Sequence, residues 1–195
     1  MRHLPAAPPA GPPLRRARAW LCAALLTLAS LALLPLPARA QFGEYEVKAA
    51  FLANFTQFVK WPAAAFADAA APFAIGILGD DPFGGALEKI AQTRTVAGRK
   101  IVIRRGRRAE ELRNCQVVFV PASERANGAA IVASLAGTHI LIVGEHDGFV
   151  KQGGAIGFTS GGGKVGFEIN HGAARSAGLE ISSRVLKLAG RVLGS

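Results

Sequence analysis

The sequence predicts an α/β fold of three layers: a central mixed, mostly parallel sheet, helices on both faces and a C-terminal β-hairpin. Short apolar runs typical of buried strands alternate along the chain with helical patterns, which favours a sheet covered by helices on both sides. In the last third, two strand-like runs flank the glycine-rich stretch 160–164, which is typical of a hairpin turn.

The first forty residues have the pattern of a secretory signal peptide. Arginines at positions 15, 16 and 18 precede an apolar run from Ala19 to Leu34, and Ala38-Arg39-Ala40 is typical of a cleavage site. A membrane-spanning helix needs about 20 apolar residues, and this run is shorter. We therefore expect cleavage after Ala40, export, and a single domain over residues 41–195.

The charge of the chain changes once this leader is set aside. The chain has 23 Lys and Arg against 13 Asp and Glu, but five arginines lie in the leader, which leaves a net charge of +5. Eight basic residues lie between Arg94 and Arg113, and we call them the basic cluster. No aromatic residue lies among them to stack on bases, so we expect no nucleic acid as partner. A solvated surface, an anionic lipid contact and an anionic protein contact remain open.

Cysteine usage gives a second constraint. Cys22 lies in the leader, so Cys115 is alone in the exported part and has no intrachain partner. It precedes the apolar run 116–120, which predicts a buried, unreactive thiol. An intermolecular disulfide is the alternative.

The first elements follow from apolar spacing and from proline. A helix is expected from Glu44 to Trp61, which lacks glycine and ends before Pro62, and its apolar positions at helical spacing are Val47, Phe51, Phe55 and Phe58. Residues 63–71 are expected to form a loop or weak turn. The apolar run 73–78 predicts a buried strand, after which Asp81 would cap a helix begun by Pro82.

The middle of the chain continues the alternation. Residues 99–105 alternate apolar with charged and predict a half-buried strand, followed by a short helix at 109–114. Buried strands are expected at 117–120 and 140–143, with a helix between them that Ser123 caps and Ala136 ends.

The C-terminal third predicts the hairpin and two short helices. Runs 155–159 and 165–169 would form an antiparallel edge of the sheet. Asn170 would cap a helix through Ala177, and Ser182 or Ser183 would cap the last helix. That helix is expected to turn Val185, Leu186 and Leu188 toward the core.

Three motifs contain residue types that could bind a ligand. Ser160 to Lys164 resembles a phosphate loop, but the glycine spacing and the following residues are wrong, so a hairpin turn is favoured. Asp80 and Asp81 follow a strand, and Glu145 follows another, at the edge where open α/β sheets bind ligands. These three carboxylates define a predicted ligand crevice; in the alternative, Asp81 is only a helix cap and Asp80 is solvated.

The remaining polar residues do not assemble into a catalytic pattern. His146, Asp147 and His171 could form an enzymatic site only if the fold brought them together. The chain has no HExxH pattern and no G-x-S-x-G elbow. The sequence therefore predicts no catalytic residues, no metal, no cofactor and no enzymatic activity.

Five segments resemble a known family. They are KAAFLANFTQFVKWP at 48–62, GILGDDPFG at 76–84, CQVVFV at 115–120, GGAIGF at 153–158, and KVGFEIN followed by AGLEISSRVLKLA within 164–189. In this order they resemble the YfiR/HmsC-type periplasmic proteins, and the resemblance spans essentially the whole chain after the leader.

The resemblance implies a function that needs no chemistry. It implies a periplasmic repressor, often a homodimer, that binds the periplasmic sensor region of an inner-membrane GGDEF diguanylate cyclase. Repression lowers cyclic di-GMP and biofilm formation, and an outer-membrane partner is a further expected input. Members of the family carry paired cysteines for redox sensing, which the lone Cys115 puts in doubt here. A periplasmic small-ligand-binding protein is the alternative function.

Candidate contacts for the cyclase are aromatic, arginine and polar residues of the two most specific segments. Aromatic and arginine side chains dominate binding hot spots. The candidates are Phe51, Asn54, Phe58, Trp61, Glu168 and Arg184. In the alternative, the phenylalanines belong to the core.

Overall fold

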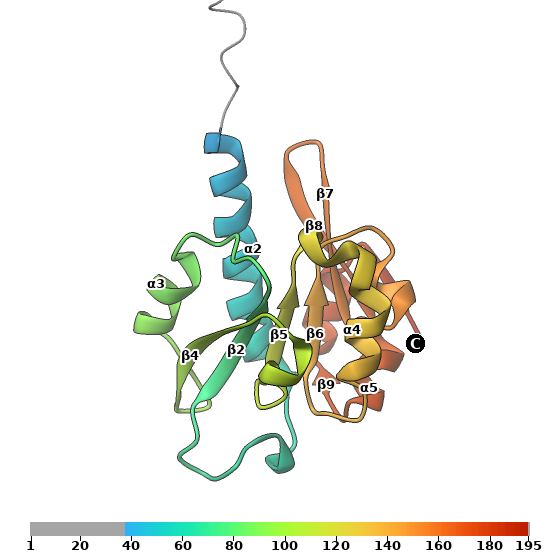
Figure 1. Ribbon diagram of the computed structural model, residues 1–195. Helices are drawn as coiled ribbons and strands as arrows, with labels where there is room; N and C mark the ends of the chain where they lie inside the picture. The colour runs from blue at the N-terminus through green and yellow to red at the C-terminus, as the bar shows by residue number, and fades with distance from the viewer. Residues whose placement is uncertain (1–37, 195) are drawn as a thin grey trace, which may run out of the picture. The chain divides into compact units, whose positions relative to one another are not determined.

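The computed structural model describes residues 38–194. Residues 1–37 of the predicted leader lie outside the described residues, so the signal peptide stays a prediction. An eight-stranded sheet runs through the described part in the order β10-β8-β7-β6-β5-β2-β4-β3 (Figure 1). Among residues 38–194, none of the helices combines the length and hydropathy needed to cross a bilayer.

The strands of this sheet come from the whole described chain. They are β2 (Phe73–Leu78), β3 (Thr95–Val96), β4 (Arg99–Gly106), β5 (Val117–Val120), β6 (Leu141–Gly144), β7 (Ile156–Gly161), β8 (Lys164–Asn170) and β10 (Arg191–Leu193). Strands β2, β4, β5, β6 and β7 run parallel, β8 is antiparallel to β7, β10 is parallel to β8, and β3 is antiparallel to β4. The predicted mixed, mostly parallel sheet is confirmed.

Helices cover both faces of the sheet, which confirms the three-layer prediction. The α-helices are α2 (Ala38–Phe58), α3 (Ala86–Thr93), α4 (Gly128–Ser134), α5 (His171–Ser176) and α6 (Ser183–Leu188). Short 3-10 helices are η1 (Ala63–Ala65), η2 (Ala109–Leu112), η3 (Ala122–Asn127) and η4 (Phe149–Gln152). Helices α2, α3, α5 and α6 pack on one face, and η2 and α4 pack on the other.

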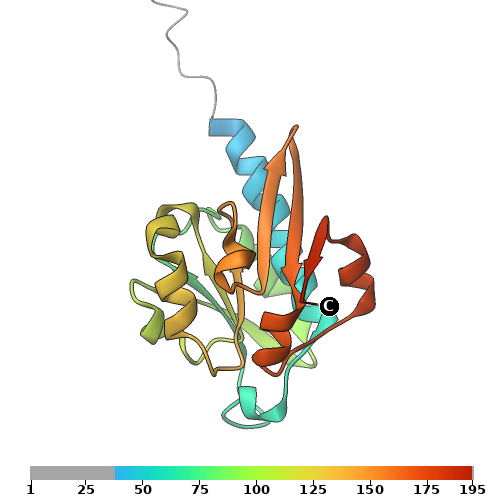
Figure 2. The same ribbon diagram turned by 90° about the vertical axis from the view of Figure 1, so that its right-hand side faces the viewer.

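The helix α2 packs along the hairpin formed by β7 and β8 (Figure 2). The ring of Phe55 lies 6.0 Å from Phe158 of β7 and 5.1 Å from Phe167 of β8, centroid to centroid. Burial of such rings stabilises the fold by about 1.5–3 kcal/mol each. This aromatic cluster therefore fixes the helix to the C-terminal part of the sheet.

The inward face of α2 differs from the one expected. Leu52 and Phe55 are buried, whereas Val47 is 45% exposed and Phe58 is 36% exposed. The helix also ends at Phe58 instead of Trp61, because Val59 and Lys60 leave it to form β1, which pairs with β9 (Glu180–Ile181). The expected apolar positions thus lie on two sides of the helix.

Two predicted helix starts were wrong. Asp81 does not cap α3, because its Oδ1 accepts from the Phe83 amide at 2.8 Å in a turn that contains Pro82. The helix begins after Gly85, whose φ of 88° breaks any continuation from Pro82. Ser123 likewise lies inside η3, and α4 begins only at Gly128.

The C-terminal predictions are largely confirmed. The hairpin turns at Gly162 and Gly163, whose φ values of 58° and 74° suit glycine. Asn170 accepts from the Ala173 amide at 2.9 Å and Ser182 from the Arg184 amide at 3.3 Å, so both cap helices. The hairpin is not a sheet edge, however, because β10 covers β8. Leu188 was expected in the core, which is wrong, since it is 73% exposed.

Candidate interaction surface

The end of α2 and the start of α6 are joined through their backbones. The amide of Ser182 donates to the carbonyl oxygen of Phe58 at 2.9 Å. Val59 pairs with Ile181, and Lys60 pairs with Glu180 in the two-stranded β1–β9 sheet. No local pattern indicates these two-residue strands, and their pairing brings the end of α2 to the start of α6, the helix that carries Arg184.

Four exposed residues of these two helices make up what we call the α2–α6 surface: Asn54, Phe58, Arg184 and Leu188. Asn54 also accepts from Nη1 of Arg94 at 3.2 Å. Asn54 and Phe58 are four residues apart on α2, as are Arg184 and Leu188 on α6, so each pair shares one face of its helix. Phe58 is 36% exposed and Leu188 is 73% exposed. Aromatic and arginine side chains are enriched among the residues that dominate protein-binding surfaces.

The other predicted contact residues lie elsewhere. Phe51 is half-buried, with its ring 5.4 Å from that of Phe167. Trp61 donates from Nε1 to the carbonyl oxygen of Gln116 at 3.1 Å. Glu168 points to the opposite face of the sheet from its neighbour Phe167, and its Oε1 lies 3.4 Å from Nε of Arg191. The backbone of Phe58 thus lies at the start of α6, two residues before Arg184, whereas Glu168 points to the opposite face of the sheet.

Glu145, one member of the predicted ligand crevice, has a full set of internal partners. Lys48 Nζ lies 2.7 Å from Oε2, the Tyr45 hydroxyl donates to Oε1 at 3.1 Å, and the Ala122 amide donates to Oε1 at 2.8 Å. Burial and the neighbouring carboxylate of Glu145 raise the pKa of Tyr45. This carboxylate joins α2 to the carboxyl end of β6.

The second contact of Lys48 is Glu44, at 2.6 Å. Lys48 and the Ser160 hydroxyl, which donates to Glu44 at 2.6 Å, lower the pKa of the Glu44 carboxyl. The network of Glu44, Lys48 and Glu145 thus links the helix, the hairpin and the central sheet.

The two aspartates of the predicted crevice differ from each other. Asp80 is exposed, whereas Asp81 is half-buried and also accepts from Nε of Arg105 at 2.9 Å. Asp81 therefore holds the turn after β2 against β4, in addition to any role toward a ligand.

The histidine candidates differ in burial and in their hydrogen bonds. His146 is 2% exposed, its Nε2 lies 3.1 Å from Oε1 of Gln152, and its Nδ1 has no partner among the described residues. Asp147 is exposed, and His171 begins α5 after β8. Within residues 38–194, no three His, Cys, Asp or Glu side chains could together hold a metal ion.

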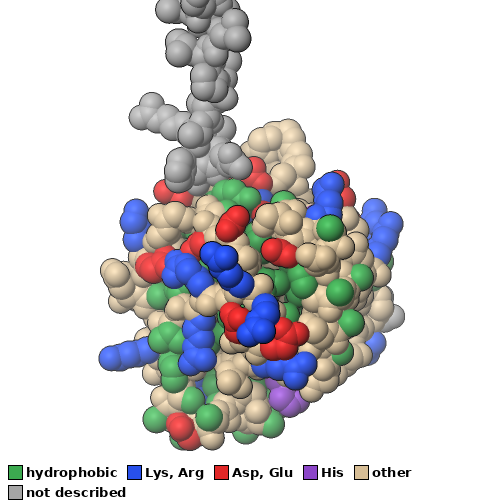
Figure 3. Space-filling view, viewed as in Figure 1, with side chains coloured by type: hydrophobic (Ala, Val, Ile, Leu, Met, Phe, Trp, Pro, Cys, Tyr) green, Lys and Arg blue, Asp and Glu red, His purple; other side chains and the backbone are tan. Residues whose placement is uncertain are grey.

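The basic cluster is partly neutralised by contacts within the chain. Arg105 pairs with Asp81 and Glu88, and Arg108 pairs with Glu111 at 2.9 Å. Burial alone would raise the pKa of Glu88, but the bond from Arg105 brings it below its ordinary value. Figure 3 shows Lys and Arg side chains mixed with Asp and Glu on this face.

Comparison with known proteins gives one family. The model of the YfiR/HmsC-like family matches residues 45–190. Among curated proteins, no sequence matches this chain.

Solved structures share less with the chain. A conserved domain protein from Vibrio cholerae O1 biovar El Tor is 12% identical with a TM-score of 0.49, over 76% of this chain and 60% of its own length. An ABC domain from Streptococcus pneumoniae in complex with L-Trp is 16% identical with a TM-score of 0.46, over 62% and 55% of the two chains. This chain thus spans less than two thirds of either protein.

Proposed function

Since this chain belongs to the YfiR/HmsC-like family, we propose that it represses a membrane-bound diguanylate cyclase by binding that enzyme's periplasmic sensor region. The family is one of periplasmic, regulatory proteins that act with membrane diguanylate cyclases. Repression in this proposal lowers cyclic di-GMP and thereby biofilm formation, and the chain catalyses no reaction of its own.

The observation that supports this proposal is the α2–α6 surface. It lies within segments 48–62 and 164–189, on which the resemblance to the family is most specific. Phe58 and Leu188 expose apolar area that the fold leaves uncovered within residues 38–194, and Arg184 adds a charge-assisted donor. A sensor region with an apolar patch beside an acidic group would complement this surface.

Export and assembly complete the proposal. The predicted signal peptide would deliver the protein to the periplasm, where the sensor region of an inner-membrane cyclase lies. A homodimer and an outer-membrane partner are further elements that the family resemblance implies. Redox control through an intrachain disulfide is not part of the proposal, because Cys115 is the only cysteine among the described residues and is buried.

The alternative function, small-ligand binding at Asp80, Asp81 and Glu145, has weaker support. Glu145 already accepts from three donors, and Asp81 is bonded to Phe83 and Arg105. A ligand in this crevice would have to compete with these internal bonds.

Binding of the purified protein to the periplasmic sensor domain of a membrane-bound diguanylate cyclase from the same organism tests the proposal. Phe58→Asp and Leu188→Asp should each weaken binding about thirtyfold, the usual effect of losing a hot spot of about 2 kcal/mol. Val47→Asp, at the middle of α2 about three helical turns before Phe58 and 45% exposed, is the matched control and should bind normally. Full binding by Leu188→Asp and Phe58→Asp would contradict the assigned surface, and no binding by the wild-type protein would contradict the function.

A further inference from the structure

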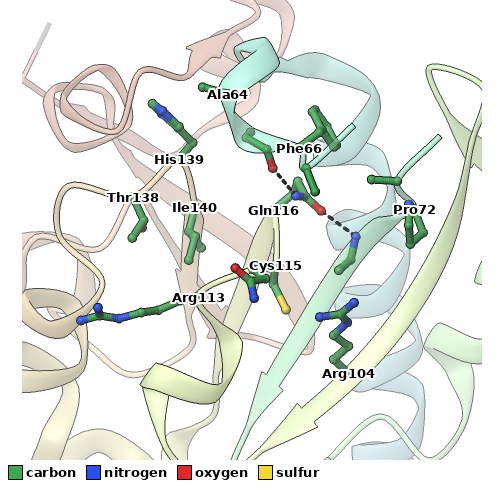
Figure 4. A pocket seen from close by; sticks show the side chains of 15 residues that line it. Ala64, Phe66, Pro72, Arg104, Arg113, Cys115, Gln116, Thr138, His139 and Ile140 are labelled. Atoms are coloured by element: carbon green, nitrogen blue, oxygen red, sulfur yellow. Dashed lines mark hydrogen bonds between the residues drawn. The ribbon is translucent and has the colours of Figure 1, made fainter. Parts of the chain in front are cut away.

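A cavity of about 510 Å³ lies at the amino-terminal ends of β2, β5 and β6 (Figure 4). The predicted ligand crevice, in contrast, lies at the carboxyl-terminal ends of these strands. Segment 64–72 closes one side, the residues before β5 and β6 form the floor, and Arg104 enters from β4. Ligand pockets of proteins commonly enclose about 300–1,000 Å³, so this volume suits a small molecule.

The cavity has an unbalanced positive charge. Arg104 and Arg113 line it, and no Asp or Glu does. Among the described residues neither arginine has a carboxylate partner, whereas their neighbours Arg105 and Arg108 both do. Arg113 donates from Nη2 to the Ser134 carbonyl oxygen at 2.8 Å, and the other N–H groups of its guanidinium have no partner among the described residues. Two guanidinium groups without a carboxylate partner, those of Arg104 and Arg113, therefore line the same cavity.

The walls of the cavity are fixed by internal hydrogen bonds. The side chain of Gln116 accepts from the Ala74 amide at 2.7 Å and donates to the Ala65 carbonyl oxygen at 2.6 Å. These bonds tie segment 64–72 to the start of β5, as the dashed lines in Figure 4 show. A pre-formed wall lowers the entropy that binding would cost.

The wall opposite the floor is apolar. Phe66, Pro72 and several alanines line it. The guanidinium of Arg99 lies 4.0 Å from the ring centroid of Phe66 and holds that ring in place. A ligand that fits would combine an anionic group with an apolar body.

We propose that this cavity binds a small organic anion, a carboxylate or a phosphate ester. Its charged group is held by Arg104, whose guanidinium points toward Cys115 and Pro72, with Arg113 at the rim below Thr138 (Figure 4). Guanidinium groups bind both kinds of oxyanion through paired donors. The proposal goes beyond repression of a cyclase and does not depend on it.

Calorimetric titration of the purified protein tests this site with four probes: phenyl phosphate, benzoate, inorganic phosphate and the neutral benzyl alcohol. At least one of the two aromatic anions, phenyl phosphate and benzoate, should bind more tightly than inorganic phosphate and benzyl alcohol. Whichever of these two anions binds more tightly identifies the charged group that the cavity prefers. Failure of both aromatic anions to bind at millimolar concentration would overturn the proposal. Equal binding of benzyl alcohol would do the same.

Variants locate the binding. Arg104→Gln should weaken the aromatic anion at least tenfold, and Arg113→Gln should weaken it less. Arg107→Gln is the matched control, because Arg107 is exposed in the same cluster but does not line the cavity, and it should leave affinity unchanged. Unchanged affinity in Arg104→Gln, or an equal loss in Arg107→Gln, would overturn the site. No cyclase enters the experiment, so its failure leaves the proposed repression intact.

Discussion

Lys48 and Glu145 form an ion pair whose side chains are only 5% and 2% exposed. Removing one partner of such a pair leaves a buried charge without compensation, which costs about 3–5 kcal/mol. We expect Lys48→Met to lower the free energy of unfolding by this amount in urea denaturation. The control is Lys60→Met, which breaks a pair that is 83% and 78% exposed and should cost under about 1 kcal/mol. Equal losses in both variants would contradict the burial of the Lys48 pair.

Cys115 illustrates how burial controls a single reactive group. Burial raises the pKa of its thiol to about 11, although Arg104 acts in the opposite direction. Because the thiolate is the reactive form, alkylation by iodoacetamide at pH 8 should be on the order of a hundredfold slower than for an exposed cysteine. Peptide mapping by mass spectrometry measures the rate at this position. A rate equal to that of a free cysteine would show an accessible thiol and reopen redox control.

At the scale of elements, Arg105 connects β4, α3 and the turn after β2. It joins β4 to Glu88 on α3 and to Asp81 in the turn after β2. The pKa of Glu88 is lowered below its ordinary value of 4.5, so the stabilisation from this contact is present above that pH and is lost as pH falls through the folded-state pKa. Arg105→Gln should therefore destabilise the protein at pH 7.

The same contact predicts a pH dependence. The difference in unfolding free energy between Arg105→Gln and the wild type should shrink as the pH falls from 4.5 through the lowered folded-state pKa of Glu88, because below that pKa Glu88 is protonated in both proteins. Denaturation series at several pH values measure this difference. A difference that stays constant from pH 7 to acid would show that the pair does not stabilise α3.

Gln116 holds the segment between η1 and β2 to the sheet. Its side chain bonds to the backbone of Ala74 and Ala65, and it is 4% exposed. Gln116→Ala leaves the buried Ala74 amide without a partner and should cost about 1–3 kcal/mol in thermal or urea unfolding. The exposed neighbour Asn114 gives the control, and Asn114→Ala should change stability by less than about 0.5 kcal/mol. A neutral Gln116→Ala would show that this segment is held by other contacts.

The elements also show what the sequence can predict. The strand β2 was predicted with its bounds because its six residues form one uninterrupted apolar run, and the structure buries all six. The hairpin was predicted because glycines separate two strand-like runs. The strands β1, β9 and β10 have two or three residues each and arise from pairing with distant segments, which no local pattern indicates. Their absence from the prediction moved the expected end of α2 and the expected edge of the sheet.

The candidate sites, too, could be predicted from the sequence only in part. Phe58 and Arg184 could be named from the family resemblance, but Leu188 was assigned to the core because its spacing from Val185 suits a buried helical face. Burial depends on what packs against α6, and nothing among the described residues covers Leu188. The cavity was not predicted at all, because its walls come from several segments that are distant in the sequence.

At the scale of the whole molecule, one central sheet connects surfaces with different character. The face with α2 and α6 presents exposed apolar residues, and Arg94 and Arg105 of the basic cluster also reach it through Asn54 and Glu88. The cavity at the amino-terminal ends of β2, β5 and β6 is lined by Arg104 and Arg113. The first suits a protein partner and the second suits an organic anion. This separation makes binding of a partner and binding of an anion testable with independent variants.

The central claim is that the α2–α6 surface represses a diguanylate cyclase, and cellular cyclic di-GMP tests it most directly. Deleting the gene should raise cyclic di-GMP only in cells that contain the cyclase whose sensor region the protein binds. Wild-type protein and Val47→Asp should restore the low level, whereas Leu188→Asp, present in equal amount, should not. An unchanged level in the deletion strain, or a rise that persists without the cyclase, would contradict the account.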